Sequence, residues 1–372
     1  MTRIFFSAGE SSGDMHGANL IRAIKEIDPA VECVGLGGKR MEAAGMELRH
    51  DLASNAIMGF VEVVKHFAFF KRLYVETVRG FEYEAPDCLV VIDYPGFNIQ
   101  IAKRASMLAI PVVWYISPQV WAWKRGRVLT IARIVEEMLV ILPFEKRLYD
   151  AVGVDCTFVG HPLLDHVAAT PIEGLYREGM VIGLLPGSRE QEIGRLFAIM
   201  VDVANGIREQ YPEARFVVPC VDEARQEQIR SIAGDFPIET VIGKTYEVLD
   251  GARFCLVASG TATVETTLFS VPMVILYRVA PLTYWLARLL VRIEHIGLVN
   301  ILAGKRIVPE FVQHDATVSK ILPVALELIA DGPKREQMLA ELRAVRDALG
   351  EAGASKRAAV QILAVAGKGS HG

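Results

Sequence analysis

The sequence has few cysteines, and they carry no metal-binding pattern. Five cysteines are scattered over 372 residues, and no two of them form a Cys-x-x-Cys pair. An odd, scattered set argues against a disulfide framework and against a zinc site, and it favours a reducing compartment.

Long apolar runs and a basic net charge are also missing. No uninterrupted apolar run reaches the roughly 18 residues of a membrane span. Residues 1–3 lead directly into a predicted strand, so we expect no signal peptide. The formal net charge of −4 gives no general attraction to nucleic acid. We therefore expect a cytoplasmic protein, and we expect any membrane contact to be from one side.

The first predicted turn lacks the GxGxxG spacing of dinucleotide-binding proteins. Residues 9–17 read Gly-Glu-Ser-Ser-Gly-Asp-Met-His-Gly, so we expect no nicotinamide cofactor. Small residues in a turn would still let a ligand approach the backbone closely. The apolar spacing that follows predicts a helix over 17–27.

Apolar residues are abundant, at 52% of the chain with a mean hydropathy of +0.30. This composition fits either large buried parallel sheets or an apolar surface patch. Short apolar runs alternate with helical stretches in two successive sets, which predicts an α/β fold. The predicted strands are 3–8, 33–38, 88–92, 111–116, 137–142 and 156–159, then 181–185, 215–219, 239–242, 254–258 and 272–277.

Two sets of βα units predict two Rossmann-like, doubly wound domains that face a central cleft. A stretch of little periodicity at 165–180 separates them. We place the first domain at 1–168 and the second at 169–345. Residues 346–372 form a C-terminal helix and tail, and one interpretation is that these helices cross back to the first domain.

A predicted strand–turn–helix at 181–193 is suited to phosphate binding. Ser188 is predicted to cap the helix, and Glu190 and Glu192 follow in its first turn. Free backbone N–H groups and the forked donor of Arg189 would meet a phosphate. The alternative is an ordinary turn with a surface arginine.

A second such turn follows the strand at 254–258. Ser259, Gly260 and Thr261 would present amides and hydroxyls to a pyrophosphate at a helix N-terminus. Glu265 lies one turn further on the same face, where a carboxylate would bind both hydroxyls of a ribose. The alternative is a cap formed by Thr261 and Glu265.

Asp93 comes directly after a buried strand of five apolar residues. Ligands of open α/β sheets bind at the carboxyl ends of the strands, so this carboxylate is a candidate general base. The alternative is that it caps the turn before the next helix.

Aromatic and basic residues are mixed over 60–75, including Phe67, Phe69 and Phe70. Aromatic bulk beside basic charge suits the surface of an anionic membrane. The alternative is a helix packed on the sheet. A similar mixture at 281–297 is either a second membrane surface or a partner-facing helix.

Eight stretches, in order over about residues 3–310, resemble the lipid A disaccharide synthase family. They are AGESSGDMHG (8–17), VIDYPGFN (91–98), SPQVWAWKRGR (117–127), LPFEK (142–146), GHPLLD (160–165), LLPGSR (184–189), ASGTATVE (258–265) and NILAGK (300–305).

The resemblance implies an inverting GT-B glycosyltransferase that needs no metal or other cofactor. It would join UDP-2,3-diacylglucosamine to 2,3-diacylglucosamine 1-phosphate in a β-1,6 link and release UDP. This step belongs to lipid A biosynthesis, within Gram-negative lipopolysaccharide, at the cytoplasmic face of the inner membrane. The implied partners are the two acylated sugars and an anionic membrane surface, with no nucleic acid.

The two lines of inference give the candidate site residues their roles. Asp93 is the first choice for the base and His16 the second. Ser188, Arg189 and the segment Ser259, Gly260 and Thr261 would meet the charge on UDP, with Glu265 on the ribose. Contacts to the sugars would come from Glu10, Ser12 and Asn300.

Other functions stay open at this point. They are another GT-B enzyme that uses a UDP-sugar with a different lipid acceptor, and a nucleotide-binding protein without turnover. A homo-oligomer is an open possibility, and acyl-chain length cannot be deduced from the chain.

Overall fold

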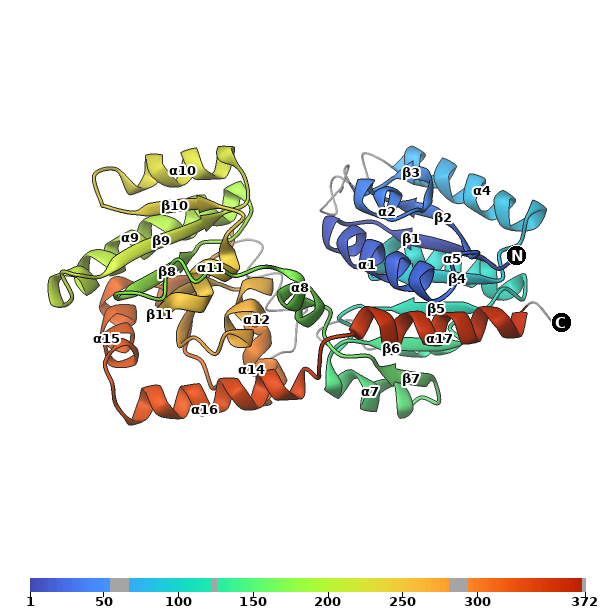
Figure 1. Ribbon diagram of the computed structural model, residues 1–372. Coiled ribbons are helices and arrows are strands. Elements are labelled where there is room, and N and C mark those ends of the chain that lie inside the picture. Colours follow the sequence, from blue (N-terminus) through green and yellow to red (C-terminus); the bar gives the residue numbers. More distant parts are fainter. Residues whose placement is uncertain (54–66, 122–125, 281–293, 370–372) are drawn as a thin grey trace. The chain divides into compact units, whose positions relative to one another are not determined.

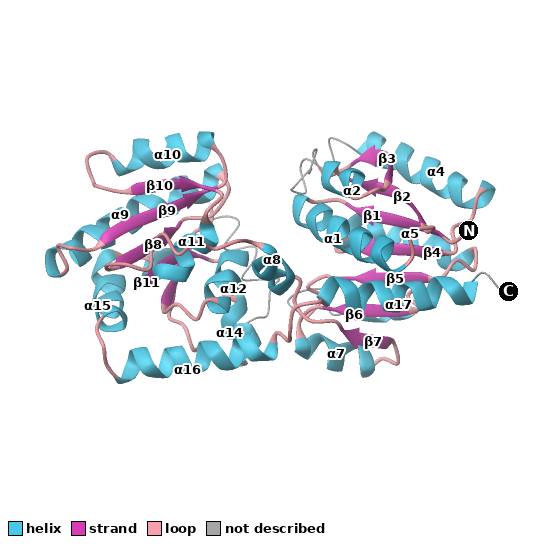
Figure 2. Ribbon diagram, viewed as in Figure 1, coloured by secondary structure: helices cyan, strands magenta, loops and turns pink. Residues whose placement is uncertain are grey.

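The computed structural model describes residues 1–53, 67–121, 126–280 and 294–369. They form two compact units, shown in Figure 1. Unit 1 comprises residues 1–165 and 349–372, and unit 2 comprises residues 166–348. Each unit is built on one parallel sheet with helices packed against it (Figure 2).

The sheet of unit 1 has seven parallel strands in the order β3-β2-β1-β4-β5-β6-β7. The order reverses between β1 and β4, and loops at such a point are where open α/β sheets bind ligands. The strands are β1 (Arg3–Ala8), β2 (Glu32–Gly37), β3 (Glu47–Asp51), β4 (Cys88–Ile92), β5 (Val112–Tyr115), β6 (Glu137–Val140) and β7 (Asp155–Phe158).

Alternate residues of the central strand β4 face opposite sides of this sheet, as the two-residue period of a strand requires. Cys88, Val90 and Ile92 belong to one apolar cluster, and Leu89 and Val91 belong to another. Both faces are therefore covered. The helices of unit 1 are α1 (Ser11–Ile27), α2 (Lys39–Ala43), α4 (Phe67–Tyr83), α5 (Pro95–Met107), α6 (Arg127–Ala132), α7 (Pro143–Asp150) and α17 (Ala354–Gly369).

The C-terminal helix α17 packs against α1 and against β4 and β5, in unit 1 (Figure 1). Its Ala358, Ile362 and Ala366 are fully buried in the same cluster as β1 and β4. The expected return of the C-terminal segment to the first domain is confirmed.

The sheet of unit 2 has six parallel strands in the order β10-β9-β8-β11-β12-β13. They are β8 (Val181–Leu185), β9 (Arg215–Cys220), β10 (Glu239–Ile242), β11 (Ala252–Ala258), β12 (Met273–Tyr277) and β13 (Glu310–Val312). The helices are α9 (Glu190–Gln210), α10 (Glu223–Ala233), α11 (Thr245–Gly251), α12 (Thr261–Leu268), α14 (Leu298–Ala303), α15 (Val318–Ile329) and α16 (Pro333–Ala348), with α8 (Leu163–Ala169) crossing the boundary between the units and a 3-10 turn η1 (Gln313–Asp315).

The predicted α/β class with two Rossmann-like sheets is confirmed, and two strands were missed. The sequence of β3 is Glu-Leu-Arg-His-Asp and that of β13 is Glu-Phe-Val, so neither has an apolar run. Both are edge strands, which need fewer buried side chains.

The predicted turn over 9–17 was wrong, because α1 begins at Ser11. The amide of Asp14 already donates to the carbonyl of Glu10, at 2.9 Å. Gly17 lies inside the helix, where a Cβ would come within 2.7 Å of the sulfur of Met41. The glycine therefore lets α1 lie close to its neighbours.

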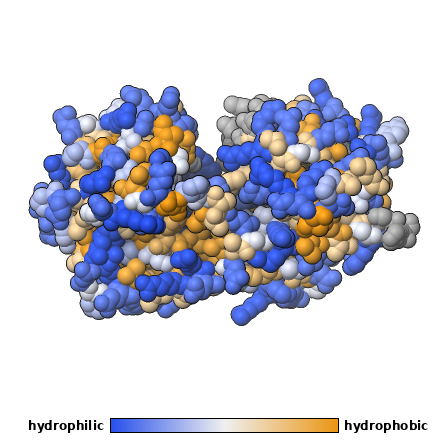
Figure 3. Space-filling view, viewed as in Figure 1, coloured by the Kyte–Doolittle hydropathy of each residue, from blue (hydrophilic) through white to orange (hydrophobic). Residues whose placement is uncertain are grey.

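The face in Figure 3 is mostly polar, with smaller groups of apolar side chains. The cores of the two units hold most of the large apolar residues, which accounts for the high mean hydropathy without a dominant surface patch on that face. Among the described residues, no helix has both the length and the apolar character needed to cross a membrane.

The carboxylate of Asp165 holds the start of α17. Its Oδ1 accepts hydrogen bonds from the amides of Gly353 and Ala354, and its Oδ2 accepts one from Ser355 at 2.9 Å. We expect Asp165→Ala to lower the free energy of unfolding of unit 1 by about 2 kcal/mol, because three helix N-terminal amides lose their acceptor.

Hydrogen exchange in α17 and urea unfolding measure this effect. Asp165→Asn keeps one acceptor oxygen and should lose less. Asp150→Ala removes only an exposed pair with Lys146 and serves as the control. Unchanged exchange in α17 of Asp165→Ala would contradict the proposed cap.

Candidate active site

The turn after β4 has an unusual backbone. Asp93 and Tyr94 both have positive φ angles, of 43° and 46°. Non-glycine residues seldom adopt this region, and consecutive strained residues persist only where the surroundings hold them. Gly9, in the turn after β1, lies against this site: a Cβ there would come within 2.3 Å of the Tyr94 ring.

Asn98 holds this turn in place and was not singled out from the sequence. It is fully buried, and its Nδ2 donates to the carbonyls of Asp93 at 2.8 Å and Ile92 at 3.2 Å. Its Oδ1 accepts from the hydroxyl of Ser7 at 2.7 Å. The end of β1 and the turn after β4 are thus joined by one side chain. The one sequence feature that indicates this role is the position of Asn98 in the first turn of α5, five residues after Asp93.

The carboxyl group of Asp93 is suited to accept a proton near neutral pH. Burial raises its pKa from 3.8 to about 7, and the negative charge of Glu10 adds to the increase. The backbone amide of Tyr94 opposes the shift. Glu10 and Asp93 are therefore within electrostatic reach of each other, at the ends of neighbouring strands.

A second buried carboxyl group, that of Glu145, also belongs to this region. Burial raises its pKa to about 8, and its environment includes the charge of Asp93. Its Oε1 accepts from the indole Nε1–H of Trp121 at 3.1 Å, and its Oε2 accepts from the amide of Leu142. Glu145 thereby links α7 to the loop after β5. Sequence analysis missed it, although it lies within the motif 142–146.

His16 lies in α1 and is partly buried, and its charge acts on His161. Burial lowers the pKa of His161 to about 3, and His16 lowers it further. The Nδ1 of His161 accepts from the amide of Leu163 at 3.2 Å. The assignment of His16 as second candidate base stays a prediction. Ser12 is exposed in the first turn of α1.

The two predicted phosphate loops of unit 2 line one cavity of about 290 Å³. Strands β8 and β11 are neighbours in the sheet, so the loops that follow them meet at the same edge. The cavity is lined by Ser188, Arg189, Glu192, Thr245, Ser259, Gly260, Thr261, Ala262 and Glu265, among others.

The helix start predicted at Ser188 was wrong. Helix α9 begins at Glu190, and Arg189 rather than Ser188 occupies the N-cap position. Ser188 is exposed and lines the cavity. The guanidinium group of Arg189 pairs with Glu192 at 3.0 Å, so an anion in the cavity would share it with that carboxylate.

Glu265 is oriented by a tyrosine. The hydroxyl of Tyr246 donates to its Oε1 at 3.2 Å. Burial raises the pKa of Glu265, and this hydrogen bond opposes the increase. The Tyr246 ring is itself held between His166 and Phe269, with ring centroids at 5.5 and 5.6 Å. Tyr246 thus positions the carboxylate of Glu265 at the cavity wall.

Asn300 lies inside the protein, so the structure gives no support to its predicted contact with a sugar. It is fully buried, and its Nδ2 donates to the carbonyl of Val308 and to Glu310. Its Oδ1 accepts from the amides of Ile307 and Val308. These four hydrogen bonds of the Asn300 side chain fix the segment 307–310, which follows α14.

The predicted membrane surface is described only in part. Residues 60–66 and 281–293 lie outside the described residues, and Phe67 begins α4. Phe69 and Phe70 are half-buried and pack against the core of unit 1.

Among the described residues, no group of three or more His, Cys, Asp or Glu side chains is placed to hold a metal ion.

Comparison with known proteins identifies relatives along the whole chain. The LpxB family, described as lipid-A-disaccharide synthetase, matches residues 4–364. The lipid-A-disaccharide synthase of Geobacter metallireducens is 40% identical over 375 residues, covering 98% of each chain.

Solved structures with little sequence identity share the fold. The calicheamicin glycosyltransferase CalG4 has a TM-score of 0.65 at 16% identity, covering 99% of each chain. The UDP-GlcNAc 2-epimerase from Neisseria meningitidis, bound to UDP-GlcNAc, has a TM-score of 0.62 at 12% identity, covering 98% of this chain and 99% of that one. These likenesses show the GT-B fold. The family model matches residues 4–364, and the chain has the GT-B fold with two strand-end loops that line one cavity. The chain therefore belongs to the lipid-A-disaccharide synthase family.

Proposed function

We propose that the chain joins UDP-2,3-diacylglucosamine to 2,3-diacylglucosamine 1-phosphate, with Asp93 as the general base and the cavity of unit 2 as the site for UDP. The activity is that of its family, a glycosyltransferase of lipid A biosynthesis. The observation that supports the residue assignment is the strained turn at Asp93, whose carboxyl has a pKa raised to about 7.

The proposed reaction is a single displacement. Asp93 accepts the proton of the acceptor's 6-hydroxyl as that oxygen bonds to the anomeric carbon of the donor. The bond from this carbon to the phosphate oxygen breaks, and its electron pair leaves with UDP. Attack from the face opposite UDP inverts the configuration and gives the β-1,6 link. A base with a pKa near the working pH is efficient in such a transfer.

Fixed donors in unit 2 would meet the charge on the leaving UDP. The N-terminus of α12 at Thr261 and Ala262 lines the cavity, and backbone amides there favour an anion. Ser188, Ser259 and Arg189 add hydroxyl and guanidinium donors. Such donors stabilise developing charge without having to reorganise. Glu265, one turn further along α12, would accept hydrogen bonds from the two ribose hydroxyls.

We also propose that the protein works as a peripheral protein on the cytoplasmic face of the inner membrane. Its family implies acylated substrates, which partition into membranes by about 0.8 kcal/mol per buried methylene. Lys71 and Arg72 are exposed on α4 beside the half-buried Phe69 and Phe70. These basic side chains would contact anionic lipid headgroups. Because the phenylalanines also stabilise the core, the charges give the cleaner test.

We expect Asp93→Asn to lower kcat by about 100-fold or more, as loss of a general base typically does. Asparagine tolerates the left-handed backbone, so the fold should persist. In the unsubstituted protein, kcat/KM should rise with pH up to about 7, because only ionised Asp93 accepts a proton. The variant should lose this limb of the profile.

A stability measurement accompanies this test. The carboxyl of Asp93 has a higher pKa in the folded state than in the unfolded state, so the folded state binds this proton more tightly. The free energy of unfolding therefore falls as pH rises from about 4 to about 7. Asp93→Asn should therefore be the more stable protein at pH 8. Asp150→Asn is the control for both measurements. Turnover close to that of the unsubstituted protein would exclude Asp93 as the base.

We expect Glu265→Gln to weaken UDP binding about tenfold or more, because hydrogen bonds to a charged acceptor are lost. Tyr246→Phe should weaken it less, and more at low pH, because the pKa of Glu265 then rises further. Calorimetric titration with UDP measures both effects. Glu213→Gln, at an exposed position, is the control. Equal affinity in all four proteins would contradict the ribose assignment.

We expect the double variant Lys71→Gln, Arg72→Gln to bind anionic vesicles about 30-fold more weakly, since each basic residue near the surface contributes about 1 kcal/mol. Co-sedimentation with phosphatidylglycerol vesicles measures the effect. Lys103→Gln, exposed on α5, is the control. Unchanged sedimentation of the double variant would refute the proposed membrane surface.

A further inference from the structure

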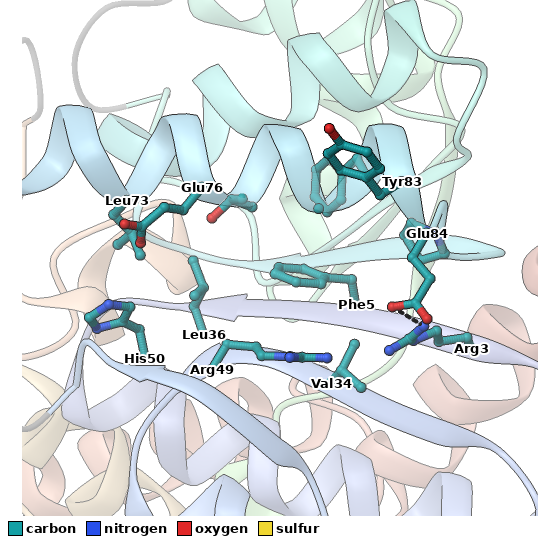
Figure 4. Close-up of a pocket in the computed structure, with 14 residues that line it drawn as sticks. Arg3, Phe5, Val34, Leu36, Arg49, His50, Leu73, Glu76, Tyr83 and Glu84 are labelled. Carbon is teal, nitrogen blue, oxygen red and sulfur yellow. Dashed lines mark ion pairs between the residues drawn. The ribbon is translucent and has the colours of Figure 1, made fainter.

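Unit 1 contains a second cavity, of about 380 Å³, between α4 and the sheet (Figure 4). Its walls are mainly apolar. One wall comes from the strands β1, β2 and β3 and the other from α4. The apolar or weakly polar lining residues are Phe5, Val34, Leu36, Leu73, Thr77 and Phe81. The volume lies within the range of small-molecule sites.

The two ends of this cavity are polar. At one end, Arg3 and Glu84 form an ion pair of 2.6 Å (Figure 4). At the other end lies His50, from β3, with Leu73 close by in the same view. Between Leu73 and Glu84 the chain advances eleven residues, which is about 16 Å along a helix. The exposed side chains of Arg49, from β3, and Glu76, from α4, also line the cavity. The space is therefore an elongated groove with a buried apolar floor and charged side chains at its rim and ends, a shape suited to an unbranched chain.

A row of aromatic rings connects the His50 end of the groove with the turn that holds Asp93. His50 contacts Phe69 with ring centroids 5.7 Å apart, and Phe69 contacts Phe70 at 5.5 Å. Phe70 in turn lies 6.1 Å from Phe97, in the first turn of α5. Phe97 is four residues beyond Asp93. A chain of ring contacts thus runs from His50, at one end of the groove, to the helix turn that follows Asp93.

We propose that this groove binds one fatty acyl chain of the acceptor sugar. The inference rests on the proposed function, because Asp93 would receive the proton of that same acceptor. Asp93 and the groove belong to one unit, whereas the predicted UDP site belongs to the other, so the acceptor's chain rather than the donor's is the occupant. The family's acylated glucosamine substrates supply the required chemistry.

Gly80 offers a way to fill the groove without disturbing the fold. It lines the cavity and lies on α4 seven residues after Leu73, almost directly in line with it at two helical turns. A Cβ there would meet no atom within 4 Å. Replacing a helical glycine also removes a destabilising residue. Val75→Phe, at an exposed position of α4 outside the groove lining, is the matched control.

The experiment measures kcat/KM for acceptors with short and long acyl chains, with one donor, in the same detergent. We expect Gly80→Phe to lower the preference for the long-chain acceptor at least tenfold, because each buried methylene is worth about fourfold. Val75→Phe should keep the preference. A loss that follows the donor's chain length, a loss confined to vesicle binding, or no change of preference would overturn the proposal.

A labelling experiment gives a readout that is independent of turnover. An acceptor with a diazirine at the end of one acyl chain should label peptides from 73–84 in the unsubstituted protein, and several-fold less in Gly80→Phe. Absence of this labelling overturns the groove as the acyl site even where the sugars react. Labelling without turnover would support the groove while the proposed function fails.

Discussion

The buried amide of Asn98 is the constraint on which the candidate base depends. It satisfies the carbonyls of Ile92 and Asp93 and binds Ser7, so two neighbouring strand ends are fixed by one side chain. With those bonds in place, two consecutive non-glycine residues are kept in the left-handed region. The result is a carboxyl group presented at the point where the strand order reverses, between β1 and β4. A looser turn would let Asp93 relax into water and return its pKa toward 3.8.

Carboxyl groups gather in this part of unit 1 at an electrostatic cost. Glu10 and Asp93 follow the ends of β1 and β4, and Glu145 lies in the first turn of α7. Burial raises the pKa of Asp93 to about 7 and that of Glu145 to about 8. Glu145 is compensated by the indole of Trp121 and by the amide of Leu142. Asp93 has a single opposing contribution, from the amide of Tyr94. The difference fits a division of roles in which Glu145 positions the loop after β5 and Asp93 remains available for proton transfer.

Periodicity and turn chemistry were sufficient to predict most of the fold, because buried parallel strands are apolar along their whole length. The edge strands β3 and β13 escaped, since a strand with one neighbour needs little apolar sequence. The start of α1 was missed because glycines that allow close packing look the same in a sequence as glycines that form a turn.

Within the candidate site, two features could be predicted from the positions of strand ends alone. They are the placement of Asp93 at a strand end and the joint lining of a cavity by the loops at 187–189 and 259–261. Asn98, Glu145 and Tyr246 could not, because each acts through a contact that is distant in sequence or buried. Asn300 shows the reverse, since the family resemblance suggested a contact with a sugar while its four side-chain hydrogen bonds are internal.

The return of the chain to unit 1 has a consequence for biosynthesis. Helix α17 supplies Ala358, Ile362 and Ala366 to the cluster that covers β1 and β4. During translation, the apolar surface that those residues will cover stays open while all of unit 2 is being made. Unit 2 is continuous in sequence and can complete its core first, whereas unit 1 must wait for its last segment. The sheet of unit 1 therefore stays incomplete while about 200 residues are added, which takes roughly 10 to 40 seconds at about 5 to 20 residues per second, and its exposed apolar surface makes this interval the one most prone to aggregation.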